Sequence, residues 1–163
     1  MSDSSGDSTA GHGACGASAL IIRDASPADA VALVPLLAAL GYPANRETIR
    51  ARLLDLQTTD PAGRTLVAES AGRLLGFATL HCTQTLHRPT PVGRITGLAV
   101  LPESRGSGTG RRLVEAAEEY FAGLAISRVE VTSGPRHQQA HPFYRHLGYE
   151  DQGIRFAKVL AGA

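Results

Sequence analysis

A glycine-rich segment in the second half of the chain carries the residues best suited to hold an anion. It reads Arg105-Gly106-Ser107-Gly108-Thr109-Gly110 and follows an apolar, strand-like stretch over 94–100. An amphipathic helical pattern begins directly after it. Backbone N–H groups of such a turn and of a helix N-terminus converge on an anion, and glycines let the anion approach closely. The segment therefore predicts a phosphate cradle.

The spacing of these glycines excludes two common nucleotide sites. A Walker A loop needs a lysine directly after its last glycine, and the only lysine of this chain is Lys158. The dinucleotide fingerprint needs G-x-G-x-x-G, whereas Gly106, Gly108 and Gly110 stand at alternate positions. The segment matches a different pattern, Arg-x-x-Gly-x-Gly.

A second motif lies one expected strand further along and reads Ala140-His141-Pro142-Phe143-Tyr144-Arg145-His146-Leu147-Gly148-Tyr149. Its pattern is Ala-x-x-Phe-Tyr-x-x-x-Gly-Tyr. Together the two motifs, at this separation, resemble the GNAT superfamily of N-acetyltransferases. The resemblance covers about residues 19–160 and implies an acetyltransferase that uses acetyl-CoA as its cosubstrate.

The resemblance implies which residues bind acetyl-CoA. The glycine-rich loop holds the pyrophosphate, and backbone groups of the preceding strand contact the thioester, where an N–H stabilises the oxyanion. His137 stands where many members carry an asparagine near the pantetheine arm. The cofactor-binding residues implied in this way are Leu98, Ala99, Val100, Arg105, Gly106, Ser107, Gly108, Thr109, Gly110, Arg111 and His137.

Acetyl transfer to an amine requires an acid and a base. The amine must be neutral to attack, although alkyl amines have a pKa near 10, and the leaving thiolate needs a proton. The resemblance makes Tyr144 the catalytic proton donor. Many members carry a glutamate base on the fourth strand, where this chain has Thr96. The base is therefore open between water and three side chains, which are His81, His87 and Glu103.

The motifs allow two further interpretations. His137 and His141 are four residues apart, as in some metal sites, but Pro142 at a helix start explains this segment more simply, so we predict no metal. A non-catalytic acyl-CoA-binding regulatory module on the same fold is the alternative function. The presence of both the glycine-rich loop and Tyr144 favours the enzyme.

The elements that must position these residues follow from hydrophobic periodicity and turn residues. We expect strands at 19–23, 65–69, 74–80, 94–100, 128–132 and 153–160, and helices at 26–41, 46–56, from the loop to Leu124, and at 140–147. Gly97 inside a strand suggests a bulge or a close backbone approach. The order predicts an α/β (α+β) fold. The GNAT resemblance implies a mixed, mostly antiparallel sheet of six to seven strands with about four helices.

Length and composition set the remaining expectations. The 163 residues suit one domain, which we assign to 19–163, behind a Ser/Gly-rich tail at 1–18 that we expect to be disordered. A net charge of +1 gives no reason to expect nucleic acid or membrane as a partner. No signal peptide or apolar span is visible, so we expect a soluble, cytoplasmic protein. Its acceptor is a small-molecule or peptide amine, and the resemblance also suggests a homodimer.

Overall fold

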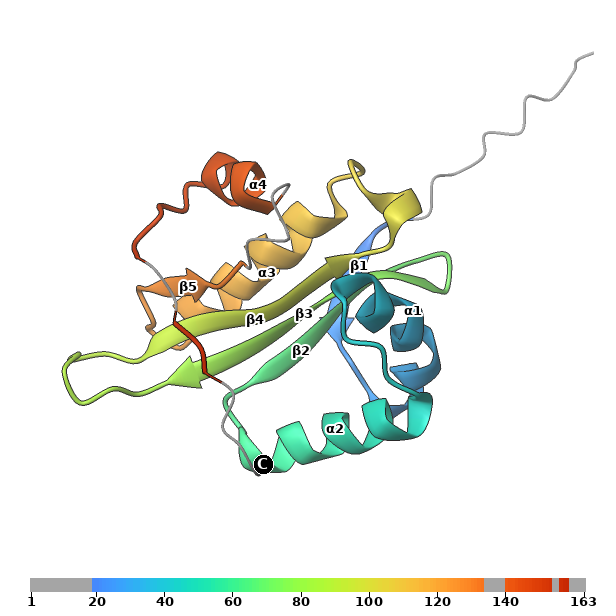
Figure 1. Ribbon diagram of the computed structural model, residues 1–163, viewed down its shortest axis with the longest axis horizontal. Helices are drawn as coiled ribbons and strands as arrows, with labels where there is room; N and C mark the ends of the chain where they lie inside the picture. Colours follow the sequence, from blue (N-terminus) through green and yellow to red (C-terminus); the bar gives the residue numbers. More distant parts are fainter. Residues whose placement is uncertain (1–18, 134–139, 154–155, 159–163) are drawn as a thin grey trace, which may run out of the picture.

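The computed structural model describes residues 19–133, 140–153 and 156–158. Five strands form one sheet in the order β1-β2-β3-β4-β5 (Figure 1). The strands are β1 Ile21–Asp24, β2 Arg64–Ser70, β3 Arg73–Thr83, β4 Val92–Val100 and β5 Val129–Val131. The first four pair antiparallel and β5 runs parallel to β4, so the sheet is mixed and mostly antiparallel, as expected.

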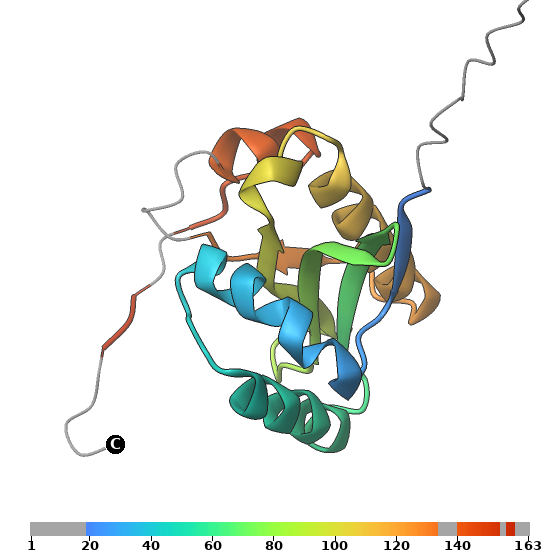
Figure 2. The same ribbon diagram turned by 90° about the vertical axis from the view of Figure 1, so that its right-hand side faces the viewer.

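Four α-helices cover this sheet, in agreement with the expected number. They are α1 Ala30–Leu40, α2 Arg46–Thr59, α3 Thr109–Gly123 and α4 Ala140–His146, with single 3-10 turns at Pro27–Asp29 and Pro102–Ser104. Helices α1 and α2 lie on one face of the sheet, and α3 and α4 lie on the other (Figure 2). The sheet thus has two covered faces with separate cores.

Alternation along the strands divides the buried side chains between these two cores. Val67, Phe77 and Ala99 pack with α1 and α2. Ala78, Leu80 and Ile95, which stand at the alternate positions, pack with α3. A strand side chain can therefore be assigned to one face of the sheet from the faces on which its sequence neighbours pack.

Helix α3 is held close against β4. An added Cβ at Gly93 would lie 2.7 Å from the ring of Phe121, which is fully buried. The apolar stripe predicted from the sequence is the buried face of this helix, with Leu113, Val114 and Ala117. This packing fixes the N-terminal end of α3 beside the end of β4.

A β-bulge interrupts the β3–β4 ladder. Thr79 pairs with Gly97 and Leu80 pairs with Ile95, so Thr96 is the extra residue. The bulge predicted from Gly97 is therefore present, and the twist that a bulge adds falls where β4 leaves its partner β5.

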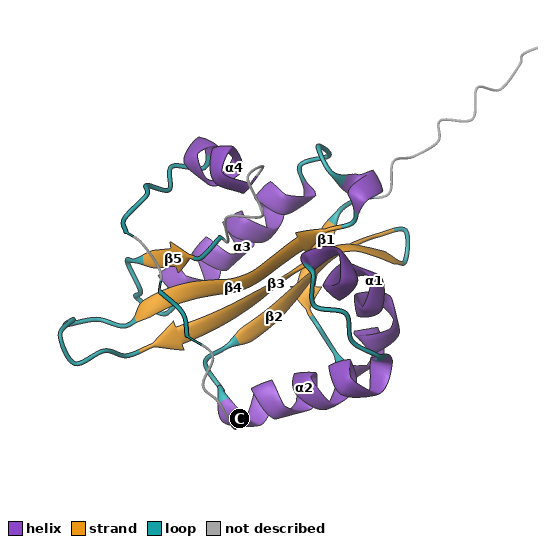
Figure 3. Cartoon of the chain, viewed as in Figure 1, coloured by secondary structure: helices purple, strands orange, loops and turns teal. Residues whose placement is uncertain are grey.

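The expected number of strands was too high. Six to seven were predicted, and five are formed in the part of the chain that the structure describes (Figure 3). The expected strand at 153–160 is not formed at Gly153 or at Phe156–Lys158. The Phe156 side chain is 89% exposed, so no neighbouring element covers the apolar position that suggested the strand. The tail at 1–18 lies outside the described residues.

Candidate active site

The glycine-rich loop joins β4 to the N-terminus of α3. Gly106 and Gly108 have φ of +79° and +84°, and Gly108 is the residue that caps the helix. This left-handed conformation is readily available only to glycine. The first helical hydrogen bond runs from the N–H of Arg112 to the carbonyl of Gly108. The N–H groups of the three residues between them have no acceptor within the helix, which suits them to bind an anion.

Two hydroxyl side chains shape the loop from within. Ser107 Oγ donates to the carbonyl of Ser104 at 2.6 Å and lies 2.9 Å from Thr109 Oγ1. Thr109 is 2% exposed, whereas Arg105, Gly106 and Gly108 are exposed. The loop is thus held in shape by its own side chains while its backbone faces solvent.

Gly110 brings the two sequence motifs together. An added Cβ there would lie 3.4 Å from Phe143 Cζ on α4 and 3.6 Å from Val100 on β4. The absence of a side chain allows α4 to rest on the first turn of α3. Gly110 is therefore a packing glycine, a role that the sequence motif alone did not reveal.

Strands β4 and β5 separate at the bulge. Their pairing covers Gly93–Ile95 on β4, and β5 ends at Val131. Leu101 donates its N–H to Leu75 on β3. Because backbone direction alternates along a strand, the N–H groups of Leu98 and Val100 point away from β3, toward the side that β5 has left. These backbone donors are available to a ligand between the strands.

Tyr144 lies on α4 with its ring among other aromatic rings. The centroids of Phe143 and Tyr149 are 5.1 and 5.7 Å from its own, both edge to face. Burial raises the pKa of Tyr144 to about 12. The phenol is thus protonated throughout the neutral and mildly alkaline range. Gly148 ends the helix as predicted, with φ +88° and a hydrogen bond from Tyr149 N–H to the carbonyl of Tyr144.

Tyr149 and Glu118 support this ring and were not recognised from the sequence as site residues. Tyr149 donates its hydroxyl to Glu118 Oε1 at 2.8 Å. Burial and this carboxylate both raise the pKa of Tyr149. Glu118 stands on α3 one position after the buried Ala117, and only its contact with Tyr149, just after α4, gives it a role.

A groove of about 1320 Å³ lies where β4 and β5 separate. It is lined by Ile95 and Thr96 at the bulge, by β5, by Glu118 of α3 and by Tyr144 of α4. Tyr42, which is 69% exposed between α1 and α2, lines it from the other face of the sheet. The groove therefore reaches both faces where β4 and β5 separate, with the Tyr144 side chain along it.

This arrangement agrees with the comparison to protein families. A sequence model described as the Acetyltransferase (GNAT) family matches residues 34–149. The chain belongs to the GNAT family of acetyltransferases. Members of this family use acetyl-CoA. The resemblance stated from the two motifs is thereby confirmed.

Individual relatives include enzymes with different acceptors. The chain is 33% identical over 121 residues to an aminoalkylphosphonate N-acetyltransferase of Salmonella typhimurium, covering 74% of this chain and 75% of the relative. It is 32% identical over 139 residues to an aminoglycoside N(6')-acetyltransferase type 1 of Stenotrophomonas maltophilia, covering 83% and 89%. An aminoglycoside N-acetyltransferase solved in complex with CoA has a TM-score of 0.75 at 18% identity, covering 87% of this chain and 95% of that one. The last likeness concerns the fold.

The three side chains named as candidate bases of this GNAT protein differ in their surroundings. Glu103 forms an ion pair with Arg73 at the opposite end of β3 from His81. His87 is exposed in the loop after β3. His81 Nδ1 lies 2.6 Å from Asp60 Oδ2, and both side chains are partly buried. His81 faces α1 and α2, because its neighbours Leu80 and Cys82 pack on the α3 side.

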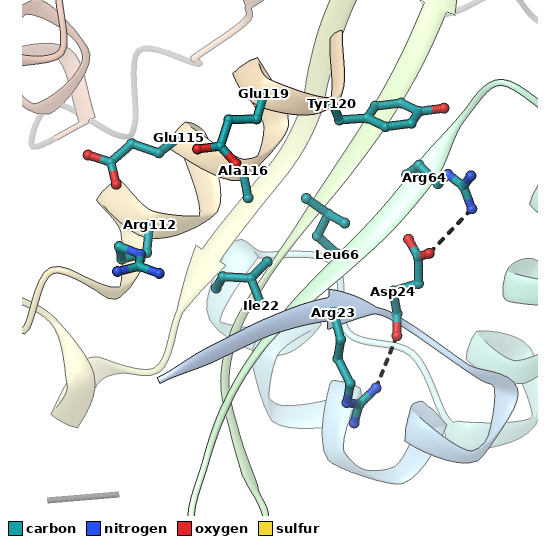
Figure 4. A pocket seen from close by; sticks show the side chains of 10 residues that line it. All are labelled: Ile22, Arg23, Asp24, Arg64, Leu66, Arg112, Glu115, Ala116, Glu119 and Tyr120. Atoms are coloured by element: carbon teal, nitrogen blue, oxygen red, sulfur yellow. Dashed lines mark hydrogen bonds and ion pairs between the residues drawn. The ribbon is translucent and has the colours of Figure 1, made fainter. Parts of the chain in front are cut away.

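A second cavity, of about 710 Å³, lies between α3 and the β1–β2 edge (Figure 4). Arg64 donates to Asp24 across these strands at 3.3 Å and lies 5.3 Å from the ring centroid of Tyr120. The cavity shares no lining residue with the larger groove. It therefore contains neither Tyr144 nor the bulge, and we take the larger groove as the candidate active site of the acetyltransferase.

The described residues contain neither a metal-binding cluster nor a membrane-spanning helix. Residues 19–133, 140–153 and 156–158 contain no group of three or more His, Cys, Asp or Glu side chains arranged to hold a metal ion. No helix among them is long and apolar enough to cross a membrane. His137, predicted to contact the cofactor, lies outside the described residues.

Proposed function

We propose that this protein is an N-acetyltransferase that transfers the acetyl group of acetyl-CoA to a primary amine by direct attack in a ternary complex. The observation that carries the proposal is the groove at the separation of β4 and β5. The partly buried Tyr144 and the bulge residue Thr96 line it, and the N–H groups of Leu98 and Val100 follow this bulge along β4. The alternative, a non-catalytic acyl-CoA-binding module, gives no reason for a proton donor at this position.

The N-terminus of α3, which is not part of the groove lining, suits the cosubstrate. Gly106 and Gly108 have space above them, since no atom of the described chain lies within 4 Å of an added Cβ at either. The N–H groups of Thr109, Gly110 and Arg111 at the helix N-terminus, with Arg105 and Arg111 nearby, would hold the pyrophosphate. Leu98, Ala99 and Val100 would contact the thioester, and His137 stays a predicted contact. Acetyl-CoA supplies the activated acetyl group.

The groups of the chain provide the proton transfers. As the amine nitrogen bonds to the acetyl carbon and the carbon–sulfur bond breaks, the N–H of Leu98 or Val100 stabilises the oxyanion. Tyr144 gives its proton to the departing thiolate and regains one from solvent. The ammonium formed by attack loses its proton to a base. Because the pKa of Tyr144 is about 12, the phenol enters the reaction protonated.

Among the candidate bases we favour His81, acting through water. The short contact with Asp60 holds the ring in one orientation. His81 pairs with Arg94 on β4, and Arg94 precedes Leu98 by four residues. The distance from the His81 ring to an amine that reacts beside Leu98 is therefore too long for direct proton transfer, so the proton would pass through water. His87, Glu103 and water alone are the alternatives. The domain extent of 19–163, the cytoplasmic location and the homodimer stay predictions of the sequence.

Binding and turnover together test the proposed function. Acetyl-CoA at about 100 times its dissociation constant should stabilise the fold by roughly 2.7 kcal/mol, which corresponds to a rise in Tm of roughly 5–10 °C for a chain of this length. ATP and NAD at equal concentration should leave the Tm unchanged. A screen of amines, including an aminoalkylphosphonate and an aminoglycoside, should then show CoA release. Stabilisation without release of CoA from any amine would favour the non-catalytic module.

A further inference from the structure

Three arginines meet one carboxylate where β4 pairs with β5. Arg128 Nε donates to Glu130 Oε1 at 2.8 Å, and Arg94 Nη2 donates to Glu130 Oε2 at 3.3 Å. Arg88, from the loop between β3 and β4, lies 4.0 Å from the same carboxylate. We call Arg88, Arg94, Arg128 and Glu130 the arginine cluster.

The arginine cluster lies on the face of the sheet that carries α1 and α2. Ile95 packs on the α3 side and an added Cβ at Gly93 would meet Phe121 of α3. Arg94, which stands between them, therefore projects to the opposite face. The same alternation applies to Glu130, because Val129 and Val131 pack on the α3 side. Tyr144 also packs on the α3 side, so the cluster and the phenol lie on opposite faces of the sheet.

The cluster has more positive charge than its carboxylate can match. A single carboxylate faces three guanidinium groups, and the hydrogen bond from Arg128 first, then the charges of the three arginines, lower the pKa of Glu130. The arginine side chains are 36–49% exposed, so their remaining N–H groups can reach a ligand. Arginine forms paired hydrogen bonds with carboxylate and phosphonate oxygens, and such charged bonds are stronger than neutral ones.

The other acidic side chains of the groove have different partners. Asp151 forms an ion pair with Arg145, and Glu118 accepts the hydroxyl of Tyr149. Glu150 lies 3.5 Å from Gln152 Nε2, and Gln152 in turn accepts a hydrogen bond from Arg128. The closest carboxylate contacts of the cluster are therefore those of Glu130 itself.

The cluster is also at a useful distance from the reacting position. Arg94, Arg128 and Glu130 line the same groove as Thr96 and Tyr144. Arg94 precedes Leu98 by four residues, or roughly 13 Å between Cα atoms in an extended strand, and its side chain spans part of that length. An acceptor that reacts beside Leu98 can thus reach the cluster with a group several bonds away from its amine.

We propose that the acceptor carries an acidic group, a carboxylate or a phosphonate, that binds Arg94 and Arg128 while the amine reacts several bonds away. This inference rests on the proposed function and narrows its acceptor to amines that also bear a negative charge. It separates the two kinds of acceptor named for the relatives, because the arginines repel a polycationic aminoglycoside and attract an aminoalkylphosphonate.

Matched acceptors test the inference. The rate of acetyl transfer is measured for 6-aminohexanoate, its neutral analogue 6-aminohexanamide, the shorter 4-aminobutanoate and 3-aminopropylphosphonate. The acids should exceed the neutral amide at least about 10-fold in kcat/KM, since one charge-assisted hydrogen bond contributes about that much. The comparison of carboxylate with phosphonate shows which acid the cluster prefers.

A second test uses variants that lower or raise the positive charge of the arginine cluster. Arg94→Gln and Arg128→Gln should each reduce kcat/KM for 6-aminohexanoate about 10- to 100-fold, with the rate on 6-aminohexanamide nearly unchanged. Glu130→Gln removes the competing carboxylate and should lower the KM for the acid a few-fold. Arg46→Gln, an exposed change on α2, serves as the control and should affect neither substrate.

Equal rates on 6-aminohexanoate and 6-aminohexanamide, unaffected by Arg94→Gln, would overturn the inference while the proposed function stands. A preference for aminoglycosides that Glu130→Gln abolishes would overturn it as well, because the carboxylate would then be the recognition group. If no amine of either kind is acetylated although acetyl-CoA raises the Tm, the proposed function fails and the inference fails with it.

Discussion

The two faces of the sheet contribute to the active site in different ways. On the face covered by α3 and α4, the candidate binding groups are largely backbone, namely the N–H groups of the glycine-rich loop and of the free edge of β4. On the face covered by α1 and α2 they are side chains from separate elements, such as Arg94 on β4 and Glu130 on β5. Every acyl donor of the family shares the CoA moiety, whereas acceptors differ.

This difference determines which part of the active site can be recognised from the sequence. A backbone site requires glycine at fixed spacings, as at Gly106 and Gly108, so it leaves a readable motif. A side-chain site can be built from charges on any strand, and these look like ordinary surface residues until the strands are paired. The α3 and α4 face, which we call the donor side because it binds the acetyl donor, therefore identifies the reaction. The α1 and α2 face, which we call the acceptor side, must identify the substrate.

The largest effect that tests this comparison is expected at Tyr144. Tyr144→Phe keeps the ring that packs against Phe143 and Tyr149 and removes the proton that the thiolate needs. Turnover should fall about 10²- to 10⁴-fold, while the affinity for acetyl-CoA changes only a few-fold. Calorimetry and a steady-state assay measure the two quantities on the same preparation.

Tyr149→Phe is the matched control for this change. It also keeps a ring and removes a hydroxyl, but that hydroxyl is bonded to Glu118 at 2.8 Å. We expect a smaller loss of turnover than for Tyr144→Phe. Near-normal turnover of a folded Tyr144→Phe enzyme, under conditions where chemistry limits the rate, would remove Tyr144 from the mechanism and leave it a packing residue.

The sequence predicted the donor side better than the acceptor side for a physical reason. Turn glycines, helix caps and apolar stripes act locally, so the loop, the end of α4 at Gly148 and the bulge at Gly97 could all be predicted. The contact between Gly110 and Phe143 could not, because it joins positions 33 residues apart and depends on how α3 and α4 pack.

The acceptor side depended still more on long-range pairing. Nothing in the sequence places Arg94 beside Glu130 until β4 and β5 are in register, and nothing joins His81 to Asp60 until α2 ends beside β3. The strand expected at 153–160 is absent from its described residues, Gly153 and Phe156–Lys158, for the same reason. Its alternating residues suit a strand, but a strand also needs a partner edge, which a local pattern cannot supply.

The next effect in size is expected in the glycine-rich loop. Gly108→Val introduces a β-branched side chain at φ +84° and at the helix N-terminus. Both effects disturb the N–H groups offered to the pyrophosphate, and loss of one charge-assisted hydrogen bond weakens binding about 10- to 100-fold. Calorimetric titration with acetyl-CoA measures the change in Kd.

Gly72→Val separates strain from ligand contact. Gly72 has φ +73° and equally open surroundings, but it lies in the turn between β2 and β3. It should lose similar folding stability and keep the wild-type affinity for acetyl-CoA. If the two variants lose affinity equally, or if folded Gly108→Val binds like the wild type, the pyrophosphate is bound elsewhere and the donor face is not a backbone site.

The smallest effect concerns the attachment of the acceptor-side helices to the sheet. Arg23 on β1 binds Asp29 through two hydrogen bonds, at 2.8 and 2.9 Å, directly before α1. It also donates to Glu69 on β2 at 2.8 Å. The hydrogen bonds from Arg23 first, and then those from the N–H and hydroxyl of Ser26, lower the pKa of Asp29 to about 2 from its usual 3.8.

A carboxyl whose pKa is lower in the folded protein stabilises the fold above its unfolded pKa and loses that contribution as pH falls. Asp29 should therefore contribute fully above about pH 5 and lose its contribution between pH 4 and pH 2. Allowing for the partial exposure of Arg23, we expect the ionised Asp29 to contribute about 1–2 kcal/mol to the free energy of unfolding. Urea unfolding of the wild type and of Asp29→Asn at pH 6 and pH 2.5 measures it: the difference in unfolding free energy between the two proteins should shrink by about two-thirds of that amount. In an Arg23→Gln background the difference should hardly vary with pH, because the partner is gone.

At pH 7 the Asp29→Asn variant should bind acetyl-CoA as the wild type does, since this contact belongs to the acceptor face. A matching loss of acetyl-CoA affinity would show that the two faces are energetically coupled, and the division between them would then have to be abandoned.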